Sequence, residues 1–281
     1  MFGVAVNHFR KANHPISVQQ STKFALSLLK NCIEITTIVV IDSSEHYDSD
    51  LDDFCQSINA SYHHYGRILS FAEAYNCGVA LLSEEWVVTM ASDIYVLPNT
   101  FTSFESFIKT HPNEPIGCLI PYLSTSDYSL QEALRLKKRQ SCYAGIMTYN
   151  LNVFPKNVFK ALGGLSTEYS GNFNDIETSL RLRDLNLEVI LVDSFAYHYG
   201  RMTLQHGSTV DLTDDCKKFQ VNHPQMLVSN TSRIRLDKVY THPLLKAAFC
   251  LSLSIRPRRL RISLENWIYK NAPSLQRVRG I

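Results

Sequence analysis

The stretch GGLSTEYSGNFNDIETSLRLRDLNLEVILVDSFAYHYG, from Gly163 to Gly200, holds the densest pattern in the chain and decides its fold. A glycine pair opens it, and a polar loop follows. Two carboxylates, Asp175 and Glu177, then stand at the predicted start of a helix. Asn186 is expected to end this helix, because asparagine tolerates the left-handed conformation that helices adopt at their ends. The predicted unit is therefore a loop followed by a short helix.

An apolar run, Leu187 to Val192, comes next and predicts a strand, with His198 just beyond it. Gly163 and Gly164 are expected to serve the backbone, through a positive φ or a close approach of another segment. Acidic residues and a histidine near a strand end are a combination that can carry chemistry. We therefore treat this stretch as the candidate site, to be tested against the rest of the chain.

Asp175 and Glu177 have two interpretations. Carboxylates in the first turn of a helix are favourable simply because they complement the helix dipole. The glycine pair before the helix and His198 after it favour a catalytic role for Asp175. His198 also has two interpretations, because a lone histidine can be a ligand but is often only a hydrogen-bonded structural residue.

Strands and helices alternate along the remaining chain. The predicted strands are Phe2 to Val6, Ile35 to Ile41, Ser61 to Tyr65, Trp86 to Met90 and Ile116 to Tyr122. Between them lie amphipathic segments with helical spacing. This alternation predicts an α/β fold with a mostly parallel, Rossmann-type sheet flanked by helices.

Three predicted strands end in polar residues, which are Asn7, Asp42 and Asp93. Ligands bind beyond the carboxyl ends of the strands in sheets of this kind. We therefore expect these three side chains to converge on one edge of the sheet and to form a binding site. Asp42 and Asp93 also suit turns, so a purely structural role for each stays open.

Composition limits the class of protein. The hydrophobic fraction of 45% is ordinary, so the chain can bury a sizeable core without covalent staples. The seven cysteines are scattered and form no C-x-x-C pair, which argues against a disulfide framework or a Cys-rich zinc site. Free thiols suit a reducing, cytoplasmic compartment. We expect no signal peptide and no membrane span.

Charge is distributed unevenly. From Arg233 to the end, eleven Lys/Arg face two acidic residues, a net charge of +9, so the rest of the chain carries −7. We expect a domain over residues 1–235 and a basic, mainly helical extension over residues 236–281. The extension has three interpretations: a solvated helical surface, a peripheral contact with an anionic membrane, or nucleic-acid binding. Nucleic acid is the least favoured, because no nucleic-acid module accompanies the charge.

The order of the motifs resembles family 2 glycosyltransferases, which are inverting enzymes with a GT-A nucleotide-sugar-binding fold. The resemblance covers roughly residues 2 to 200. The matching pieces are VAVN (Val4 to Asn7), VVIDSS (Val39 to Ser44), FAEAYNCGVALL (Phe71 to Leu82), WVVTMASDIYVLP (Trp86 to Pro98), GG (Gly163 to Gly164), NDIETSLRLRD (Asn174 to Asp184) and DSFAYHYG (Asp193 to Gly200).

The resemblance implies a donor site. Asp42 matches an aspartate that accepts a hydrogen bond from the nucleotide base, and Asn7 ends the first matching strand in the same site. Asp93 matches the last aspartate of the family's D-x-D, which binds the divalent metal, whereas Ala91 stands in place of the first. His198 matches a histidine that approaches the metal or the diphosphate.

The resemblance also implies catalytic residues. The family's base lies in an E-D-x-D segment at a helix start, which reads Asn174-Asp175-Ile176-Glu177 in this chain. Asp175 matches the base, and Asn174 replaces the glutamate. Glu177 replaces the last aspartate and is assigned to the acceptor or to a positioning role.

The predicted reaction is transfer of a sugar, with inversion, from a nucleoside-diphosphate sugar to a hydroxyl acceptor. A carboxylate must take the acceptor's proton. A divalent cation, Mn²⁺ or Mg²⁺, neutralises the leaving diphosphate. The expected donor is a UDP-sugar, and the expected acceptor is a glycan or a lipid-linked saccharide. A lipid-linked acceptor would bring the protein to the inner face of a membrane, in agreement with the basic extension.

Two other functions stay open. A nucleotidyltransferase would need a glycine-rich, basic phosphate loop after the first strand, which Asn7 to Arg10 does not supply. A catalytically inactive GT-A-like nucleotide-sugar-binding or scaffold protein is favoured by Ala91 and Asn174. The retained Asp175 speaks against it. Donor binding without turnover would identify such a scaffold.

Overall fold

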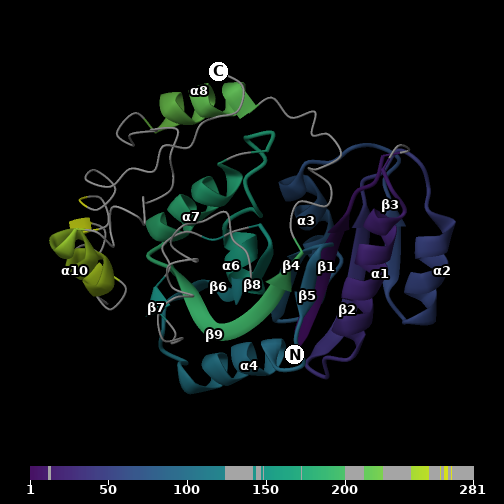
Figure 1. The fold of residues 1–281 in the computed structure, drawn as a ribbon, viewed down its shortest axis with the longest axis horizontal. Coiled ribbons are helices and arrows are strands. Elements are labelled where there is room, and N and C mark those ends of the chain that lie inside the picture. Colours follow the sequence, from purple (N-terminus) through teal and green to yellow (C-terminus); the bar gives the residue numbers. More distant parts are fainter. Residues whose placement is uncertain are drawn as a thin grey trace.

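A computed structural model describes residues 1–11, 14–123, 142–143, 147, 149–171, 173–199, 212–223, 242–252, 260, 263–264 and 267. Within these residues, helices cover both faces of one curled sheet (Figure 1). The strands are β1 (Phe2–His8), β2 (Ile35–Asp42), β3 (Ser61–His64), β4 (Trp86–Ala91), β5 (Ile94–Val96), β6 (Ile116–Leu123), β7 (Cys142–Tyr143), β8 (Leu151–Pro155) and β9 (Glu188–His198). The helices are α1 (Ser17–Lys30), α2 (Ser49–Ser57), α3 (Phe71–Ala80), α4 (Thr100–Thr110), α6 (Lys156–Ala161), α7 (Asn174–Asp184), α8 (Leu212–Asn222) and α10 (Pro243–Ser252).

The sheet has the strand order β3-β2-β1-β4-β8-β6-β9-β5, and β7 pairs with β9. Its N-terminal half is parallel, as predicted, because β1 runs parallel to β2 and β4, and β2 runs parallel to β3. Every residue of β1 is buried. A continuous apolar strand of this kind needs cover on both faces, which the helices provide.

The other half of the sheet mixes directions. β8 is antiparallel to β4 and to β6, and β5 and β7 are antiparallel to β9, whereas β6 and β9 are parallel. β9 is long enough to curve across the molecule from β7 to β5 (Figure 1). The prediction of a mostly parallel sheet therefore applies to the half that carries the predicted donor site.

Two apolar cores lie on the two faces of the sheet. On one face, α1, α2 and α4 pack through side chains such as Leu26, Phe101 and Phe104. On the other face, α3, α6 and α7 pack through residues such as Tyr75 and Leu182. Full burial of each large apolar side chain contributes about 1.5–3 kcal/mol. These two cores hold the strand ends in fixed relative positions.

α10 also reaches the core beneath α3 and α7. Leu245 of α10 is 6% exposed and belongs to that core. Ala248 and Leu264 pack against it as partly buried side chains. A segment from the predicted basic extension therefore contributes apolar contacts to the α/β core.

Several predicted elements differ from the structure. β1 continues through His8 and β9 continues through His198, beyond the apolar runs that predict them. The polar sequence around Asp214 and Asp215 predicts a loop, but in the structure it forms the start of α8. The sequence of Asp127 to Gln140 is rich in charged residues and predicts a helix or lid, but this segment lies outside the described residues, as does most of 236–281. Among the helices that are described, none combines the length and the apolar character needed to cross a bilayer.

Candidate active site

The carboxyl ends of β1, β2 and β4 meet at one edge of the sheet. His8 of β1 lies beside Asp42 of β2, and Asn7 lies beside Ala91 of β4. Asp93 follows shortly after the end of β4. The structure therefore gathers the three predicted donor-site residues near the edge where parallel sheets bind ligands.

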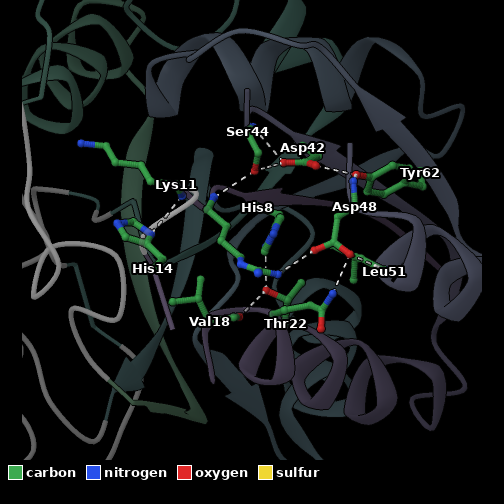
Figure 2. Close-up of polar contacts among 12 residues, drawn as sticks. His8, Lys11, His14, Val18, Thr22, Asp42, Ser44, Asp48, Leu51 and Tyr62 are labelled. Atoms are coloured by element: carbon green, nitrogen blue, oxygen red, sulfur yellow. Dashed lines mark hydrogen bonds and ion pairs between the residues drawn. The ribbon is translucent and has the colours of Figure 1, made fainter. Parts of the chain in front are cut away.

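Asp42 is fully buried and is oriented by donors on both carboxylate oxygens. The backbone N–H of Ser44 donates to Oδ1 over 2.9 Å, and the Ser44 hydroxyl donates to the same oxygen. The Tyr62 hydroxyl donates to Oδ2 (Figure 2). Burial, followed by the bond to Asp42, raises the pKa of Tyr62, so this hydroxyl keeps its proton at neutral pH. The result is a fixed carboxylate acceptor at the end of β2.

His8 adds an acceptor that sequence reasoning missed, because the polar run from Asn7 to Pro15 predicts a loop rather than the end of a strand. The Thr22 hydroxyl donates its hydrogen to the Val18 carbonyl over 3.1 Å, so it accepts from His8 Nδ1 over 2.8 Å (Figure 2). The ring hydrogen is thus on Nδ1, and Nε2 carries a lone pair. Burial lowers the pKa of His8, which keeps the ring neutral.

Two buried acceptor atoms at this edge have no hydrogen-bond partner among the described residues. They are Nε2 of His8 and Oδ1 of Asn7. Buried polar atoms are nearly always paired in folded proteins, so an unpaired one asks for a further partner. Both atoms accept hydrogen bonds, which matches a ligand that brings N–H or O–H groups.

Asp48 fastens the loop after β1 to the N-terminus of α2. Its carboxylate accepts hydrogen bonds from the Leu51 backbone N–H over 3.0 Å and from Gln19 Nε2 over 2.5 Å. Arg10 pairs with it over 3.3 Å, and the Arg10 backbone N–H donates to Ser44 Oγ over 2.9 Å. These bonds hold the Arg10 guanidinium at Asp48 and the Arg10 backbone at Ser44, which itself bonds to Asp42.

Asp93 and His198 are brought together by the antiparallel pairing of β5 with β9. His198 Nε2 lies 3.6 Å from Asp93 Oδ2, and the two side chains are 11% and 13% exposed. The Tyr199 backbone N–H donates to the Asp93 carbonyl over 3.0 Å. A carboxylate and an imidazole form a donor set that suits Mn²⁺. Both residues predicted to contact the metal therefore lie side by side.

Asp93 and His198 supply two donors. In the described part of the chain, no three His, Cys, Asp or Glu side chains are arranged to hold a metal ion. Ala91 occupies the position where the resemblance expects another aspartate. Two donors fit a cation that arrives with a diphosphate, because phosphate oxygens and water complete the coordination shell.

The glycine pair fastens the loop before α7 to α3. Gly163 and Gly164 have φ values of +70° and +86°. A Cβ on Gly164 would lie 2.6 Å from Asn76 Oδ1. Asn76 belongs at this place because its side chain accepts from the Leu165 N–H over 2.8 Å and donates to the Leu165 carbonyl over 3.0 Å. The predicted need for positive φ and close approach is confirmed.

The chain just before α7 is held by side chains on both sides. Asn174 accepts from the Tyr169 N–H over 3.0 Å and donates to the Tyr169 carbonyl over 2.7 Å. Phe173 has a φ of +69°, which is rare for a bulky residue, and its ring stacks on Phe219 of α8 with centroids 4.6 Å apart. Strained residues of this kind persist only where the surroundings hold them.

Asp175 is a buried carboxyl in the first turn of α7. It is 7% exposed, and its Oδ1 accepts a hydrogen bond from the Ile176 N–H over 2.8 Å. Burial raises its pKa from 3.8 to about 6, although backbone hydrogen bonds act in the opposite direction. A carboxyl with a pKa near neutrality can exchange a proton at physiological pH.

Glu177 contacts α8. His223, just after that helix, lies with Nε2 2.6 Å from Glu177 Oε2. Asp215 in the first turn of α8 accepts hydrogen bonds from the backbone N–H groups of Ser170 and Gly171, both over 2.8 Å. α8 therefore clamps the loop before α7 at one end and the first turn of α7 at the other. Sequence reasoning missed Asp215 and His223, because these contacts join residues more than forty positions apart.

No family model and no curated protein matches this chain.

Solved structures do match. A structure of GalNAc-T7 with UDP, GalNAc and Mn²⁺ aligns over 70% of this chain and 43% of its own, with 15% identity and a TM-score of 0.53. S. aureus TarS 1–349 in complex with UDP-GlcNAc aligns over 78% of this chain and 64% of its own, with 13% identity and a TM-score of 0.59. This chain thus spans less than half of the first protein and less than two thirds of the second.

The similarity establishes the fold. A second structure of S. aureus TarS 1–349 aligns over 82% of this chain at 12% identity, with a TM-score of 0.56. The chain has a GT-A-like α/β fold, as the motif order predicts. At these identities the comparison concerns the path of the backbone, and the chemistry must be argued from the side chains.

Proposed function

We propose that this chain is an inverting glycosyltransferase that moves a sugar from a nucleoside-diphosphate sugar to a hydroxyl acceptor. The observation that carries the proposal is the buried carboxyl of Asp175, whose pKa is raised to about 6. It lies at the start of α7 in a GT-A-like fold. The order of the motifs, from VAVN to DSFAYHYG, supports membership of family 2.

In the proposed reaction, the acceptor oxygen bonds to the anomeric carbon while the bond from that carbon to the diphosphate oxygen breaks. The nucleoside diphosphate leaves with the electron pair. Asp175 takes the acceptor's proton, so it must be ionised when the acceptor binds. With a pKa of about 6, it is mostly ionised at pH 7 and is a stronger base than an ordinary aspartate.

Asp93 and His198 are proposed to hold a divalent cation with the diphosphate. When bound, the cation neutralises the negative charge that develops on the leaving group. The carboxylate–imidazole set favours Mn²⁺ over Mg²⁺. The structure of GalNAc-T7 with UDP and Mn²⁺, which has a similar fold, supports this choice.

Asp42 and Asn7 are proposed to hold the nucleoside. The fixed carboxylate of Asp42 accepts from a base N–H, and the Asn7 Oδ1 accepts from a ribose hydroxyl or a base N–H. The TarS complex with UDP-GlcNAc supports a UDP-sugar donor. Glu177, predicted as a catalytic residue, is proposed to position α7 through its contact with His223.

The acceptor is proposed to be a glycan or a lipid-linked saccharide, in the synthesis of a polysaccharide by a cytoplasmic enzyme. A lipid carrier would bring the protein to the inner face of a membrane. The basic residues 236–281 support this idea through their net charge. Flotation of the full-length protein with anionic liposomes tests it, and protein that stays in the soluble fraction would count against it.

A catalytically inactive nucleotide-sugar-binding protein is the second candidate. Ala91 favours it, because it leaves Asp93 and His198 as the two protein donors at the expected metal position. The buried Asp175 favours catalysis, since a binding protein gains nothing from burying an ionisable carboxyl at a cost in stability.

The deciding experiment measures donor binding by calorimetry and donor hydrolysis over a panel of nucleotide sugars, with Mn²⁺, Mg²⁺ or chelator. Wild type is compared with Asp93→Ala and Asp175→Asn. Asp184→Asn is the matched control, because Asp184 is an exposed acid at the far end of α7.

The proposal expects Asp93→Ala to lose metal-dependent binding. It expects Asp175→Asn to bind donor and lose turnover, with the control unchanged. Turnover that survives in Asp175→Asn would remove the proposed base. Donor binding without turnover in wild type would establish the inactive binding protein instead.

A further inference from the structure

α8 lies beside α7 and packs through a small apolar cluster (Figure 1). The buried members of this cluster are Tyr169, Ile176 and Phe219, and Phe173 and Leu180 pack against them as partly buried side chains. The cluster is separate from the two cores that cover the faces of the sheet. Among the described residues, the apolar contacts of α8 are therefore with α7, which carries the proposed base, and with the loop before it.

Three side chains of α8 share one face of the helix. Asp215, Phe219 and His223 are four residues apart, and the His223 N–H donates to the Phe219 carbonyl over 2.9 Å, which continues the helical pattern. Residues four apart lie one above another on a helix. Asp215 bonds to two loop N–H groups, and His223 bonds to Glu177. These polar contacts fix the two ends of α8, and Phe219 is held between them.

α7 starts from an unusual backbone conformation. Its N-cap residue, Phe173, has a φ of +69° and a ψ of −11°, which lie in the left-handed region. N-cap residues normally have extended backbone angles, and the left-handed region is unfavourable for a bulky residue. The Phe173 carbonyl accepts a helical hydrogen bond from the Glu177 N–H over 2.7 Å. The backbone angles of Phe173 therefore set the direction in which α7 leaves the loop.

The ring of Phe173 is held by α8. It stacks on Phe219 with centroids 4.6 Å apart and planes 19° apart. Tyr169 lies against both rings, at 6.1 Å from Phe173 and 5.7 Å from Phe219. Phe219 is 2% exposed, so its ring is shielded from water. A bulky residue keeps a strained conformation only where neighbouring groups hold it, and Phe219 supplies that support from a separate helix.

The Asp175 carboxyl belongs to the same first turn. Asp175 lies two residues after Phe173, and its Oδ1 accepts a hydrogen bond from the Ile176 N–H over 2.8 Å. Ile176 packs in the cluster with Phe219, and Asp175 itself is 7% exposed. If Phe173 left the left-handed region, the first turn of α7 would rotate. Both the direction and the burial of the Asp175 carboxyl would then change.

We propose that Phe219 is a positioning residue: by stacking on Phe173, it keeps the left-handed turn that directs the Asp175 carboxyl. The inference rests on the proposed function, in which Asp175 takes the acceptor's proton. The alternative is that the ring of Phe219 only fills space beside Tyr169. The two roles differ in what position 173 must supply, because positioning needs the backbone conformation, whereas filling space needs the ring.

Two substitutions of Phe173 separate these roles. Phe173→Ala and Phe173→Gly both remove the ring, but only glycine adopts a positive φ without strain. Phe219→Ala removes the stacking ring from α8, and Phe219→Ala/Phe173→Gly tests whether an unstrained turn makes that ring dispensable. Val221→Ala is the control, because Val221 lies on the same helix and is 77% exposed.

Every variant is measured as the full-length protein. Carbon-13 NMR of the carboxyl groups, assigned with Asp175→Asn, gives the pKa of Asp175 without any substrate. Amide hydrogen exchange at Ser170 and Gly171 reports whether α8 stays docked. Donor turnover gives kcat and KM separately, and thermal unfolding monitors the fold. The two Phe173 variants leave α8 unchanged, so they decide the question even where Phe219→Ala does not fold.

We expect Phe173→Ala and Phe219→Ala to move the pKa of Asp175 from about 6 toward its ordinary value of 3.8, because a rotated carboxyl meets water. The kcat should fall by up to about 100-fold, with a smaller change in KM, because a catalytic group is misplaced. Phe173→Gly should keep more of the pKa shift and of kcat than Phe173→Ala. It should also restore both in the Phe219→Ala background.

Equal losses in Phe173→Ala and Phe173→Gly would overturn the proposal, because the ring rather than the backbone conformation would then matter. So would a pKa of Asp175 that is unchanged in Phe219→Ala. Absence of turnover in wild type, with a pKa of Asp175 that depends on Phe219 as expected, would remove the proposed glycosyl transfer and would leave the positioning role in place.

Discussion

Replacing Asp175 by asparagine should make the folded protein more stable at neutral pH while it abolishes turnover. Burial shifts the pKa of Asp175 from 3.8 to about 6. Below pH 3.8 the carboxyl is protonated in both the folded and the unfolded chain. Between pH 3.8 and about pH 6, the Asp175 carboxyl is ionised in the unfolded chain and protonated in the folded protein. The free energy of unfolding therefore falls as the pH rises through this range.

The size of the effect follows from the shift. Each pKa unit corresponds to ~1.4 kcal/mol, so a shift of about two units lowers the free energy of unfolding by ~3 kcal/mol above pH 6. Asparagine carries no charge and keeps an oxygen that can accept the Ile176 N–H. Asp175→Asn should therefore gain up to ~3 kcal/mol at pH 7.5 and almost nothing below pH 4.

Urea unfolding of both proteins at pH 7.5, 5 and 4 measures the difference directly, through the midpoint at constant slope. Asp184→Asn, an exposed acid on the same helix, should change stability by less than ~0.5 kcal/mol at every pH. A stability difference between Asp175→Asn and wild type that does not depend on pH would refute the reasoning, because it would show that burial does not shift this carboxyl.

Three further predictions concern contacts that position the site. His198→Ala should weaken Mn²⁺-dependent UDP binding, because it removes one of the two proposed metal donors. Calorimetry with and without chelator checks this, and equal loss without metal would contradict it. Tyr62→Phe should weaken UDP binding several-fold without changing metal dependence, because Asp42 loses the hydroxyl that orients Oδ2. Asp215→Ala should lower stability by about 1–3 kcal/mol, because two loop N–H groups lose their acceptor. It should also move the acid limb of the pH–rate profile to lower pH, because a loosened α8 would admit water to Asp175 and lower its pKa. An unchanged acid limb would show that α8 supports the fold without affecting the pKa of Asp175.

The sequence predicts the parallel half of the sheet well because its strands are continuous apolar runs that end in polar residues. Asn7 and Asp42 could be placed at one edge on that basis alone, and register confirms it. The structure also places Asp93 and His198 side by side, but through β5, a strand of only three residues that the pattern did not reveal. A strand this short has too few residues to show alternation.

Contacts between distant segments are the part that the sequence could not predict. The pattern for β9 stops at Val192 because Asp193 and Ser194 are polar, yet the strand continues to His198 because β5 pairs with its end. Asp215 looks like one more acid in a polar stretch. Its role appears only when α8 is placed against the loop before α7, a contact across more than forty residues.

Leu245 determines where this protein can be shortened. The change in charge near residue 235 suggests a convenient end point for a smaller recombinant version. Removing α10 would take Leu245 out of the core beneath α3 and α7 and would expose apolar surface there to water. The truncated protein should therefore self-associate through this exposed surface. We therefore expect the smallest version that stays monomeric to retain α10. This helix belongs to the basic residues 236–281 and also to the packed core of the α/β fold.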